Sequence, residues 1–532
     1  MTFPAALARI HSMNLKKIDL NEQFKRALRT MEDTSQNVFI TGKAGTGKST
    51  LLRLFRETTK KQIVVLAPTG VAALNVQGQT LHSFFRFKTD ITPDKVKKLS
   101  EKSPYRNIYL KLEAIVIDEV SMVRADLLDC IDRFMRFNGR QSDRPFGGAQ
   151  MILIGDLYQL PPVVTSKERE IFSTHYPSPY FFDAAAFKNF SMNYIELEKI
   201  YRQSDANFIR LLNSIRNNSA TEEDLEAINE RFRPDFEPSR DEFFIYLTTT
   251  NLQAQEINNT QLEKITGKVY SYPGEKRGDF ESHYLPTAID LSLKAGSQIM
   301  MLNNDSMGRW VNGSVGEIIE ILTDDEPHVI RVRLMDEHTV DVTPYTWKLS
   351  RFSYDKEADK VVSETIGSFT QYPLMLAWAV TIHKSQGKTF DRVIIDIGKG
   401  TFSHGQMYVA LSRCTTLDGI FLKKKLEKRH IFMDWRVVKF VTQYQYGISE
   451  NELPLQKKIT LLQDAISEKR QLEILYLKSN DEKSRRVIAP TFVGELEYLG
   501  KKYTGVIAYD SKRQGARTFR ADRILELKTL DV

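Results

Sequence analysis

A chain of 532 residues, 41% hydrophobic and 27% charged, is long enough for several globular domains, because single cores stop growing well below that length. Two cysteines and nine scattered histidines exclude a disulfide scaffold and a structural metal cluster. No run of about 18 apolar residues occurs, and the amino terminus lacks the pattern of a secretory signal, which argues against a membrane protein. We therefore expect a cytoplasmic location.

The formal net charge of +7 is unevenly distributed along the chain. Residues 455–532 contain 16 lysines and arginines against 11 acidic residues, so this stretch supplies +5 of the total. A basic bias favours a polyanionic partner, although a solvated basic face explains it at least as often.

The first half of the chain alternates short apolar, β-rich runs with helical segments, which predicts a parallel sheet wrapped by helices. Strands are predicted at residues 37–41, 62–67, 114–117 and 151–154, with helices after the first two. Strands recur at residues 245–247 and 393–397, with a helix near 403–413. The sequence therefore predicts a second, similar α/β unit.

Four further segments organise the second half. Residues 317–370 alternate and turn like a small antiparallel barrel inserted into the second α/β unit. The charged run at 423–429 and the polar stretch at 443–454 predict an exit from that unit and a linker. From about residue 455 onward we expect a separate small α+β module.

A phosphate-binding loop is predicted where the strand at 37–41 gives way to a helix. Residues 42–49 read GKAGTGKS, and every position of the phosphate-loop pattern is filled. Backbone N–H groups would wrap the phosphates, Lys48 would meet the β and γ oxygens, and Ser49 would ligate Mg²⁺. The expected ATP contacts in this loop are Gly42, Ala44, Gly45, Thr46, Gly47, Lys48, Ser49 and Thr50.

Carboxylates are expected beside this loop. Asp118 and Glu119 follow the apolar strand at 114–117, so Asp118 would hold the metal and Glu119 would polarise the attacking water. A solvated acidic pair in a turn is the alternative, but it does not explain the four apolar residues before it. Gln159, after the next strand, could orient water against the γ-phosphate.

Together these segments resemble the Pif-type superfamily-one DNA helicases, cousins of the RecD-like motors. From about residue 20 to about residue 422 the motifs occur in the order of that family: LNEQ (20–23), GKAGTGKST (42–50), APTGVAA (67–73), GQTLHSFF (78–85), DEVSM (118–122), GDLYQLPPV (155–163), LEKIYRQ (197–203), TIHKSQGKTF (381–390) and YVALSR (408–413). The resemblance implies two RecA-like domains that couple ATP hydrolysis to 5′-to-3′ movement on single-stranded DNA and to unwinding. It also implies that Gln23 contacts adenine.

The segment TIHKSQGKTF looks partly like a second phosphate loop, with Gly387 and Lys388 before Thr389. It lacks the leading glycine of such a loop, so a second nucleotide site is excluded. The resemblance implies instead that this segment faces both DNA and the ATP cleft, with Gly387 on the nucleotide side.

Arginines are expected to complete the ATP site. Gln406, Ala410 and Arg413 share one face of the helix at 403–413, and Arg413 stands at its end. We assign Arg413 as the arginine finger, with Arg202 as its partner on the γ-phosphate. The alternative is a helix-end arginine that bonds backbone carbonyls.

DNA contacts are expected in both α/β domains, and HSFFRFK at 82–88 interleaves aromatic with basic residues, as in strand-binding grooves. At least one of Phe84, Phe85 and Phe87 belongs to the core. The candidate contacts are Pro68, Thr69, Gly70, His82, Ser83 and Phe84 in the first domain and Asn251, His383, Lys384 and Ser385 in the second.

The expected architecture is α/β, with two RecA-like parallel-sheet domains, small insertions and a carboxy-terminal α+β module. The domains are predicted as 1–190 with a wedge insertion at 86–106, 191–435 with the barrel at 317–370, a linker at 436–454 and a module at 455–532. ATP and Mg²⁺ are the expected cofactors, and single-stranded and forked duplex DNA the partners. We expect a monomer associated with the nucleoid.

The carboxy-terminal module resembles WYL domains through an arginine–proline segment and a closing R-x-F-R-x-x-R-I pattern. Arg486, Arg517, Arg520 and Arg523 fit that pattern, although the Trp-Tyr-Leu triplet is not intact. The resemblance implies recognition of nucleic acid or a nucleotide-like ligand, and a small capping domain with a solvated basic face is the alternative.

Two other functions remain open from the sequence. The motor residues alone do not distinguish a helicase from a translocase or remodeller that leaves duplexes intact. A ligand-sensing nucleic-acid-binding regulator with a vestigial motor is disfavoured, because Lys48, Asp118, Glu119, Arg202 and Arg413 are all retained.

Overall fold

The structure is a computed structural model that describes residues 20–88, 90–164, 166–239 and 242–530. It divides into two compact units, which are treated separately below. The amino-terminal unit comprises residues up to 216 together with 220–432. The carboxy-terminal unit comprises residues 217–219 and the chain from 433 onward.

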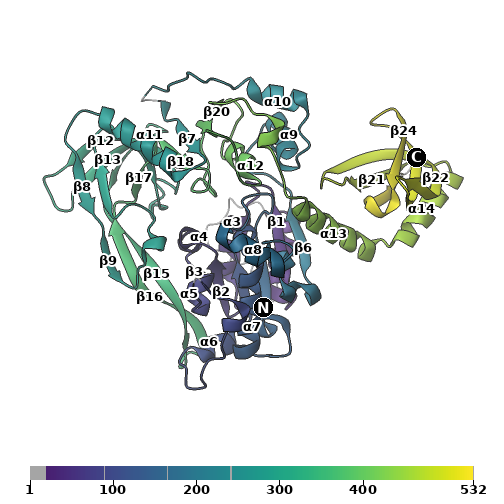
Figure 1. Ribbon diagram of the computed structural model, residues 1–532, viewed down its shortest axis with the longest axis horizontal. Helices are drawn as coiled ribbons and strands as arrows, with labels where there is room; N and C mark the ends of the chain where they lie inside the picture. Colours follow the sequence, from purple (N-terminus) through teal and green to yellow (C-terminus); the bar gives the residue numbers. More distant parts are fainter. Residues whose placement is uncertain (1–19, 89, 165, 240–241, 531–532) are drawn as a thin grey trace. The chain divides into compact units, whose positions relative to one another are not determined.

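The amino-terminal unit contains a six-stranded, all-parallel sheet, which we call the first lobe together with its helices (Figure 1). Its strands are β1 (Val38–Gly42), β2 (Ile63–Ala67), β3 (Gln79–Thr80), β4 (Ala114–Ile117), β5 (Gln150–Ile154) and β6 (Asn193–Leu197), in the order β3-β2-β4-β5-β1-β6. Its helices are α2 (Glu22–Asp33), α3 (Lys48–Thr58), α4 (Gly70–Asn75), α5 (Leu81–Phe85), α6 (Arg106–Lys111), α7 (Ala125–Asn138) and α8 (Ser166–His175).

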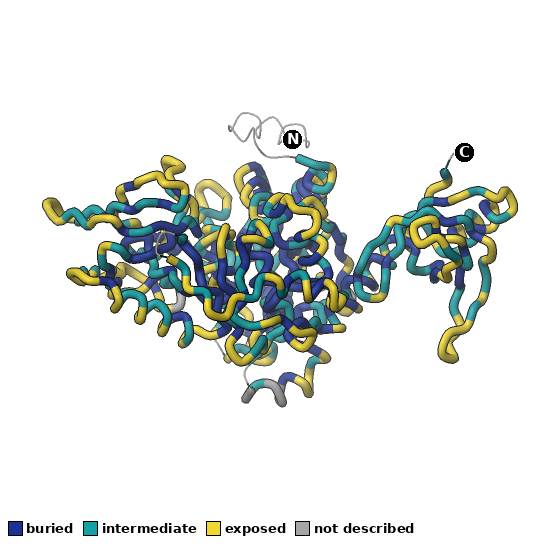
Figure 2. Tube along the Cα trace, turned by 90° about the horizontal axis from the view of Figure 1, so that it is seen from above, coloured by how far each residue is buried: buried dark blue, intermediate teal, exposed yellow. Residues whose placement is uncertain are grey.

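The strands of this sheet are apolar runs because helices cover the sheet and remove it from water. Every residue of β1, β4 and β5 is buried, and Figure 2 draws all buried positions in dark blue. The sheet includes β6, which pairs with β1, so the first lobe extends to Leu197 rather than ending near residue 190.

A second parallel sheet forms the second lobe of the same unit. Its strands are β7 (Ile245–Thr248), β18 (Ala379–Thr381), β19 (Val393–Asp396) and β20 (Ile420–Leu422), in the order β18-β7-β19-β20. Helices α9 (Ala206–Arg216), α10 (Glu222–Asn229), α11 (Asn251–Lys264) and α12 (Gln406–Leu411) accompany it. The predicted strands at 245–247 and 393–397 and the helix near 403–413 are therefore confirmed.

Antiparallel sheets are inserted between β7 and β18, as predicted, but they begin near Tyr270 rather than near residue 317. The strands are β8 (Tyr270–Pro273), β9 (Glu275–Gly278), β10 (Asp290–Leu293), β11 (Gln298–Met301), β12 (Val315–Leu322), β13 (Val329–Leu334), β14 (Thr339–Val342), β15 (Tyr345–Asp355), β16 (Lys360–Gln371) and β17 (Leu374–Leu376). They form the sheets β14-β13-β12-β11-β17, β15-β16-β9 and β10-β8. Strands β8 and β9 escaped prediction because they lack the apolar run of a buried strand, and every residue of β9 is exposed.

The long hairpin of β15 and β16 reaches the first lobe (Figure 1). The backbone N–H of Phe352 donates to the Gln79 side chain at 2.8 Å, and that of Val361 donates to Gln62 at 2.7 Å. Lys111 of α6 pairs with Asp359 at 2.7 Å. The segment predicted as a wedge, 86–106, lies just before α6 and contains one short 3₁₀ turn at Pro93–Lys95 in its described residues.

The carboxy-terminal unit is one antiparallel sheet with two helices. Its elements are α13 (Trp435–Glu452), α14 (Leu455–Ser467), β21 (Leu472–Leu477), β22 (Lys483–Tyr498), β23 (Lys501–Asp510), β24 (Gly515–Arg520) and β25 (Ile524–Thr529). The strand order is β24-β23-β22-β21-β25. Leu462 and Ala465 of α14 pack on the apolar face of this sheet, beside Ile474.

The segment 436–454, predicted as a linker, is helix α13 and belongs to the carboxy-terminal unit. Its Gln445 donates to Asp481 at 2.5 Å, and Ser449 donates to the backbone oxygens of Ile524 and Leu525. Polar side chains that look solvated in the sequence are thus buried hydrogen-bonding groups. The fold class itself is confirmed: two parallel-sheet α/β lobes, antiparallel insertions and an α+β module. No helix in the described part of the chain is long and apolar enough to span a bilayer.

Candidate nucleotide and nucleic-acid site

The predicted phosphate loop joins β1 to α3 and contains three glycines with positive φ. Gly45 has φ +80°, and a Cβ added there would lie 2.6 Å from Cβ of Arg202. A Cβ on Gly42 would lie 2.6 Å from the Leu197 carbonyl oxygen. Side chains are therefore excluded from both positions, and the loop closes tightly against the chain that follows β6.

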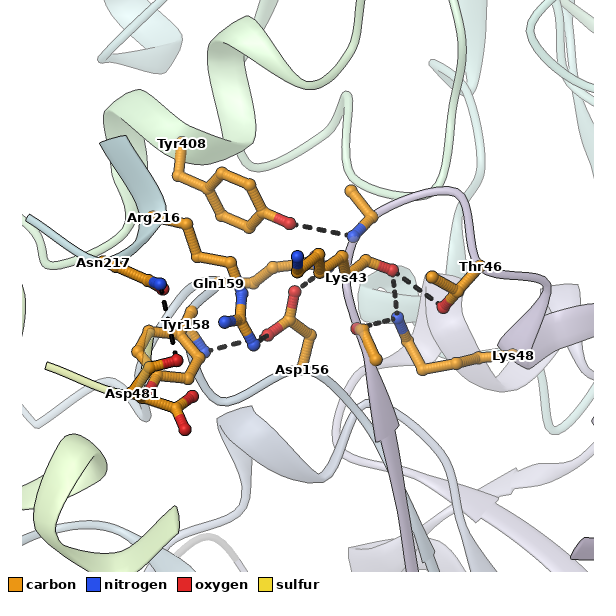
Figure 3. Close-up of polar contacts among 12 residues, drawn as sticks. Lys43, Thr46, Lys48, Asp156, Tyr158, Gln159, Arg216, Asn217, Tyr408 and Asp481 are labelled. Carbon is orange, nitrogen blue, oxygen red and sulfur yellow. Dashed lines mark hydrogen bonds and ion pairs between the residues drawn. The ribbon is translucent and has the colours of Figure 1, made fainter. Parts of the chain in front are cut away.

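Lys48 folds back into its own loop, where it donates to the carbonyl oxygens of Gly42 at 2.7 Å and Lys43 at 3.1 Å (Figure 3). Burial lowers the pKa of Lys48, while the charges of Asp156 and Glu119 oppose that shift. A buried cation satisfied by neutral oxygens is well prepared to exchange them for an anionic phosphate.

Asp118 and Glu119 follow β4 at the same sheet edge as the loop. Burial and then the charge of Glu119 raise the pKa of Asp118 to about 7. Burial also raises the pKa of Glu119, against the opposing charges of Lys48 and Arg413. Glu119 has φ +49°, an unfavourable value for a non-glycine residue, and such backbone conformations are often found at functional sites.

A third carboxylate in the cleft was not predicted. Asp156 is fully buried and accepts hydrogen bonds from the backbone N–H of Tyr158 at 3.1 Å and from Gln159 Nε2 at 3.3 Å (Figure 3). Arg216 lies 3.5 Å from Asp156 and 3.7 Å from the centre of the Tyr158 ring. These contacts fix the turn that carries Gln159.

The second lobe reaches this cluster through Gln386, a residue of the TIHKSQGKTF segment. Gln386 Nε2 donates to Glu119 Oε2 at 3.0 Å and to Gln159 Oε1 at 3.3 Å. The side chains expected to handle water, from the ends of β4 and β5, are therefore joined by one amide from the other lobe. The sequence contained the signal, since this glutamine stands two residues after Lys384, but only its neighbours were chosen.

The two predicted arginines meet at Ser412. Arg202 donates to the Ser412 carbonyl oxygen at 3.1 Å, and Arg413 donates to the Ser412 hydroxyl at 2.9 Å. Arg413 is 1% exposed and also bonds carbonyl oxygens of Val409, Ser385 and Lys388. In this structure Arg413 therefore bonds carbonyl oxygens, as the alternative described, and its role as the arginine finger stays a prediction.

These two guanidinium groups are close enough to influence each other. Burial and then the charge of Arg202 lower the pKa of Arg413 to about 9. Burial likewise lowers the pKa of Arg202. Two buried like charges held by neutral oxygens favour an incoming anion, because an anion would relieve their repulsion.

Tyr408 of α12 also contacts the phosphate loop, although only its motif had been noted. The backbone N–H of Ala44 donates to the Tyr408 hydroxyl at 2.8 Å (Figure 3). This amide is one of those expected to bind phosphate. In this structure the Tyr408 hydroxyl, from the second lobe, therefore accepts the hydrogen bond that the Ala44 amide would otherwise donate to the nucleotide.

At the outer end of the loop, Gln23 is held by Glu198. Gln23 Nε2 donates to Glu198 Oε2 at 3.0 Å, and the Glu198 backbone N–H donates back to Gln23 Oε1 at 3.0 Å. Tyr201 is 44% exposed beside Gly47. Ser49 and Thr50 lie in the first turn of α3, and Ser49 is exposed.

The nucleic-acid candidates of the first lobe follow β2 and β3, at one end of the sheet, whereas the phosphate loop and carboxylates follow β1, β4 and β5. Thr69 is exposed and caps α4, Pro68 is half-buried, and Gly70 is buried. His82 and Ser83 are partly exposed on α5. The candidates for DNA binding and those for nucleotide binding therefore lie at the same end of the strands, but after different strands of one parallel sheet.

Phe84 does not lie on that surface. It is 4% exposed and packs edge-on against Phe85, Tyr109 and Phe352. Its assignment as a base-stacking residue is wrong for this structure, because helix α5 turns it into the core beneath the β15–β16 hairpin. Phe85 is also buried, at 1% exposure, and the order of aromatic residues in the sequence did not reveal that both belong to the core.

In the second lobe, Asn251 starts α11 after β7, while His383 and Lys384 follow β18. Asn251 and Lys384 are exposed and His383 is partly buried. Ser385 is fully buried and donates to the Ile382 carbonyl oxygen at 2.7 Å. Its predicted contact with DNA is therefore wrong for this structure. Gly387 is exposed with φ +79° and open space around it.

The four arginines of the carboxy-terminal unit do not form one group. Arg486 pairs with the buried Asp510 at 2.7 Å, so it serves an internal ion pair rather than a surface contact. Arg517 is exposed. Arg520 lies 5.2 Å from the Tyr503 ring and pairs with Asp522, and the charges of Arg523 and Arg520 both act on Tyr446. Arg520 and Arg523 thus stand beside partly exposed tyrosines.

The fold and this cleft define a two-lobed phosphate-loop nucleotide-binding protein. The sequence profile of the PIF1-like helicase family matches residues 19–226, and that of the WYL domain matches residues 457–529. The ATP-dependent DNA helicase PIF1 of Emericella nidulans is 30% identical to this chain. The match covers 78% of this chain and 62% of that relative. The Bdellovibrio bacteriovorus ATP-dependent DNA helicase Pif1 is 32% identical over 81% of this chain and 94% of the relative.

Solved structures agree. The crystal structure of Bacteroides sp Pif1 in complex with ADP-AlF4 matches with a TM-score of 0.73 and 39% identity, over 81% of this chain and 98% of that one. The same Bacteroides protein bound to ssDNA matches with a TM-score of 0.58 and 38% identity, over 81% and 98% of the two chains. The chain belongs to the PIF1-like helicase family and carries a WYL domain at its carboxy-terminal side.

Proposed function

We propose that this protein is an ATP-driven motor that moves 5′ to 3′ along single-stranded DNA and separates duplex DNA ahead of it. The observation that carries the proposal is the cleft in which one lobe supplies the phosphate loop and carboxylates and the other supplies Gln386 and Arg413. The direction of travel follows from the resemblance of the motifs. Bacteroides Pif1, which is related over most of this chain, has been crystallised with ssDNA.

ATP would bind with its phosphates in the loop and its adenine beside Gln23. The backbone N–H of Ala44 and the Nζ of Lys48 now bond a hydroxyl and carbonyl oxygens, which phosphate oxygens would replace. The donor set also fits Mg²⁺, because the Ser49 hydroxyl and the buried Asp118 carboxylate are hard oxygen ligands. When bound, the ion would neutralise charge on the β- and γ-phosphates.

In the proposed reaction, Glu119 accepts a proton from the attacking water while Gln159 orients that water. Gln386 holds the carboxylate of Glu119 and the amide of Gln159 at a fixed separation. Arg202 and Arg413 stabilise the charge that develops on the γ-phosphate, once Arg413 exchanges its carbonyl partners for phosphate oxygens.

Movement would follow because one segment, TIHKSQGKTF, would both bind DNA and contact the ATP site. Lys384 is exposed toward solvent, whereas Gln386 bonds the catalytic carboxylate. A DNA phosphate bound at Lys384 would therefore shift the loop that orients Glu119. Closing on ATP and opening on product release would then draw the strand past the two lobes. We expect the protein to act as a monomer, at the nucleoid, on single-stranded and forked DNA.

Lys48→Ala should reduce DNA-stimulated ATP hydrolysis by at least about 10²-fold, because it removes the cation that meets the phosphates.

Glu119→Gln should bind ATP with unchanged affinity and lower kcat by roughly 10² to 10⁴, because only the base is lost. Both are measured by steady-state hydrolysis and by equilibrium binding of a fluorescent ATP analogue. Lost nucleotide affinity in the glutamate variant would contradict its role as the base.

Gln386→Ala should lower kcat for ATP by about ten-fold and leave KM within about two-fold, because a hydrogen bond of about 1.4 kcal/mol to the catalytic group is lost. Gln141→Ala, at an exposed glutamine, serves as the control. The decisive readout is the ratio of hydrolysis with and without single-stranded DNA, measured at saturating ATP. A Gln386→Ala protein with an unchanged ratio would contradict the proposed coupling.

The direction and the strand separation are tested together with forked and tailed duplexes. With ATP, a duplex with a 5′ single-stranded tail should be unwound, and a duplex with only a 3′ tail should remain intact. Measured by release of a labelled strand, unwinding of the 3′-tailed substrate alone would refute the direction. Displacement of streptavidin from a single strand without duplex separation would identify a translocase instead.

The WYL domain is proposed to hold single-stranded DNA or to regulate the motor. The tyrosines near Arg520 and Arg523 provide ring surfaces for bases, and the guanidinium groups provide charge for phosphates. The net basic composition of this part of the chain agrees with that partner.

Replacing both Arg520 and Arg523 by alanine should weaken binding of an oligonucleotide and reduce the salt slope of log K by about 1 to 2, because up to two phosphate contacts are lost. Binding is measured by fluorescence anisotropy between 50 and 200 mM salt, a range chosen because it changes affinity strongly. Arg485→Ala is the matched control, since Arg485 pairs with Glu473 and Glu526. Equal slopes in all three proteins would leave the arginines without a role in binding.

A further inference from the structure

An exposed phenylalanine on the second lobe is supported from below by a histidine ring. Phe402 is 62% exposed, and its ring lies parallel to that of His383, with an interplanar angle of 11° and centroids 6.2 Å apart. The backbone N–H of Phe402 donates to Gln406 at 3.1 Å, and Thr401 donates to the His430 carbonyl oxygen at 2.9 Å. The ring is therefore held in place while one of its faces meets solvent.

His383 serves this arrangement as a ring rather than as a charge. It lies two residues after the end of β18 and is partly buried. Burial lowers the pKa of His383 from its ordinary value of 6.5, so the imidazole is neutral at neutral pH. A neutral ring has no charge to pair with a phosphate, but it is a suitable support for a second aromatic ring.

The surroundings of the pair are basic. Lys384 and Lys399 are exposed on the two loops that carry the rings, and Lys424 donates to the Gly398 carbonyl oxygen at 3.4 Å. The nearby carboxylate of Asp396 is occupied, since it accepts from Gln253 at 2.7 Å and from the Gly398 backbone N–H at 2.9 Å. Ammonium groups on either side of a stacked ring suit a chain of bases joined by phosphates.

The topology explains why these groups meet. Strands β18, β7 and β19 are neighbours and parallel, so the loops that follow them leave the same edge of the sheet. His383 and Lys384 follow β18, Asn251 follows β7, and the loop with Lys399 and Phe402 follows β19. Leu252 of α11, also at this edge, is 76% exposed. The edge therefore combines apolar and basic side chains that a solvated protein surface normally keeps apart.

We propose that the free face of Phe402, backed by His383, stacks on a base of single-stranded nucleic acid, with Lys384 and Lys399 contacting the flanking phosphates. This inference rests on the proposed function and identifies one base-binding position within it. An exposed phenylalanine without a ring beneath it is an ordinary surface feature, as Phe137 on α7 illustrates at 38% exposure, with Arg133 5.6 Å from its ring centre. The ring-on-ring support and the lysines distinguish Phe402 from it.

The test uses the full chain and fluorescently labelled oligothymidylate, with binding measured by anisotropy. Phe402→Ala should bind about ten-fold more weakly, which corresponds to about 1.4 kcal/mol, whereas Phe402→Tyr should bind like the parent protein. Phe137→Ala is the matched control and should leave affinity unchanged. Circular dichroism checks that each variant is folded.

A second oligomer that lacks bases but keeps the sugar–phosphate chain separates stacking from charge. On this abasic strand the parent protein and Phe402→Ala should bind equally, while Lys399→Ala should weaken binding to both strands. A Phe402→Ala protein that binds oligothymidylate as tightly as the parent, or that loses as much affinity for the abasic strand, overturns the inference.

Two further results complete the test. Compared with the parent protein and its four native tryptophans, Phe402→Trp should show additional fluorescence that is quenched by oligothymidylate and unaffected by the abasic strand, and this readout stands even if the alanine variant misfolds. Fluorescence that does not respond to oligothymidylate overturns the stacking inference. Failure of the parent protein to bind either strand refutes the proposed function itself.

Discussion

The bond network around Glu119 is the constraint on which the catalytic interpretation depends. Gln386 comes from the second lobe and bonds both Glu119 and Gln159, which belong to different strand ends of the first lobe. A carboxylate buried in a cleft changes its basicity steeply with any change in its partners, because the low dielectric strengthens each contact. A small rotation of one lobe therefore alters the reactivity of a group on the other without any further device.

One carboxylate–arginine pair, Arg216 with Asp156, joins the two lobes in the cleft, whereas the cationic groups expected to meet the phosphates bond neutral partners. Arg202 and Arg413 bond neutral oxygens, Lys48 bonds carbonyl oxygens, and Tyr408 accepts from the loop amide. Neutral partners satisfy buried groups at little cost, yet they are weaker than a phosphate. Arg202, Arg413 and Lys48 are thus not committed to internal ion pairs and can exchange their neutral partners for an anion.

Local signals in the sequence were enough to identify the parts whose conformation is dictated locally. The phosphate loop needs glycines at fixed positions and stands between an apolar strand and a helix, so its geometry follows from ten residues. Helix α13 was missed because Gln445 and Ser449 look solvated until the sheet that receives their hydrogen bonds is present. The partners of Arg413 were missed for the same reason: helical spacing gave its face, but the carbonyl oxygens of Ser385 and Lys388 come from a distant loop.

The parallel sheets give these contacts a common origin. In both lobes the chain leaves the strands at one edge, so residues far apart in sequence gather there by topology alone. In the first lobe the strand order is β3-β2-β4-β5-β1-β6. The nucleotide-binding candidates follow β4, β5 and β1, and the DNA-binding candidates follow β2 and β3. In the second lobe, the one segment after β18 carries Lys384 and Gln386, so it belongs to both groups. A motor that couples DNA binding to ATP hydrolysis would use such a shared segment, and here Lys384 and Gln386 lie only two positions apart in the chain.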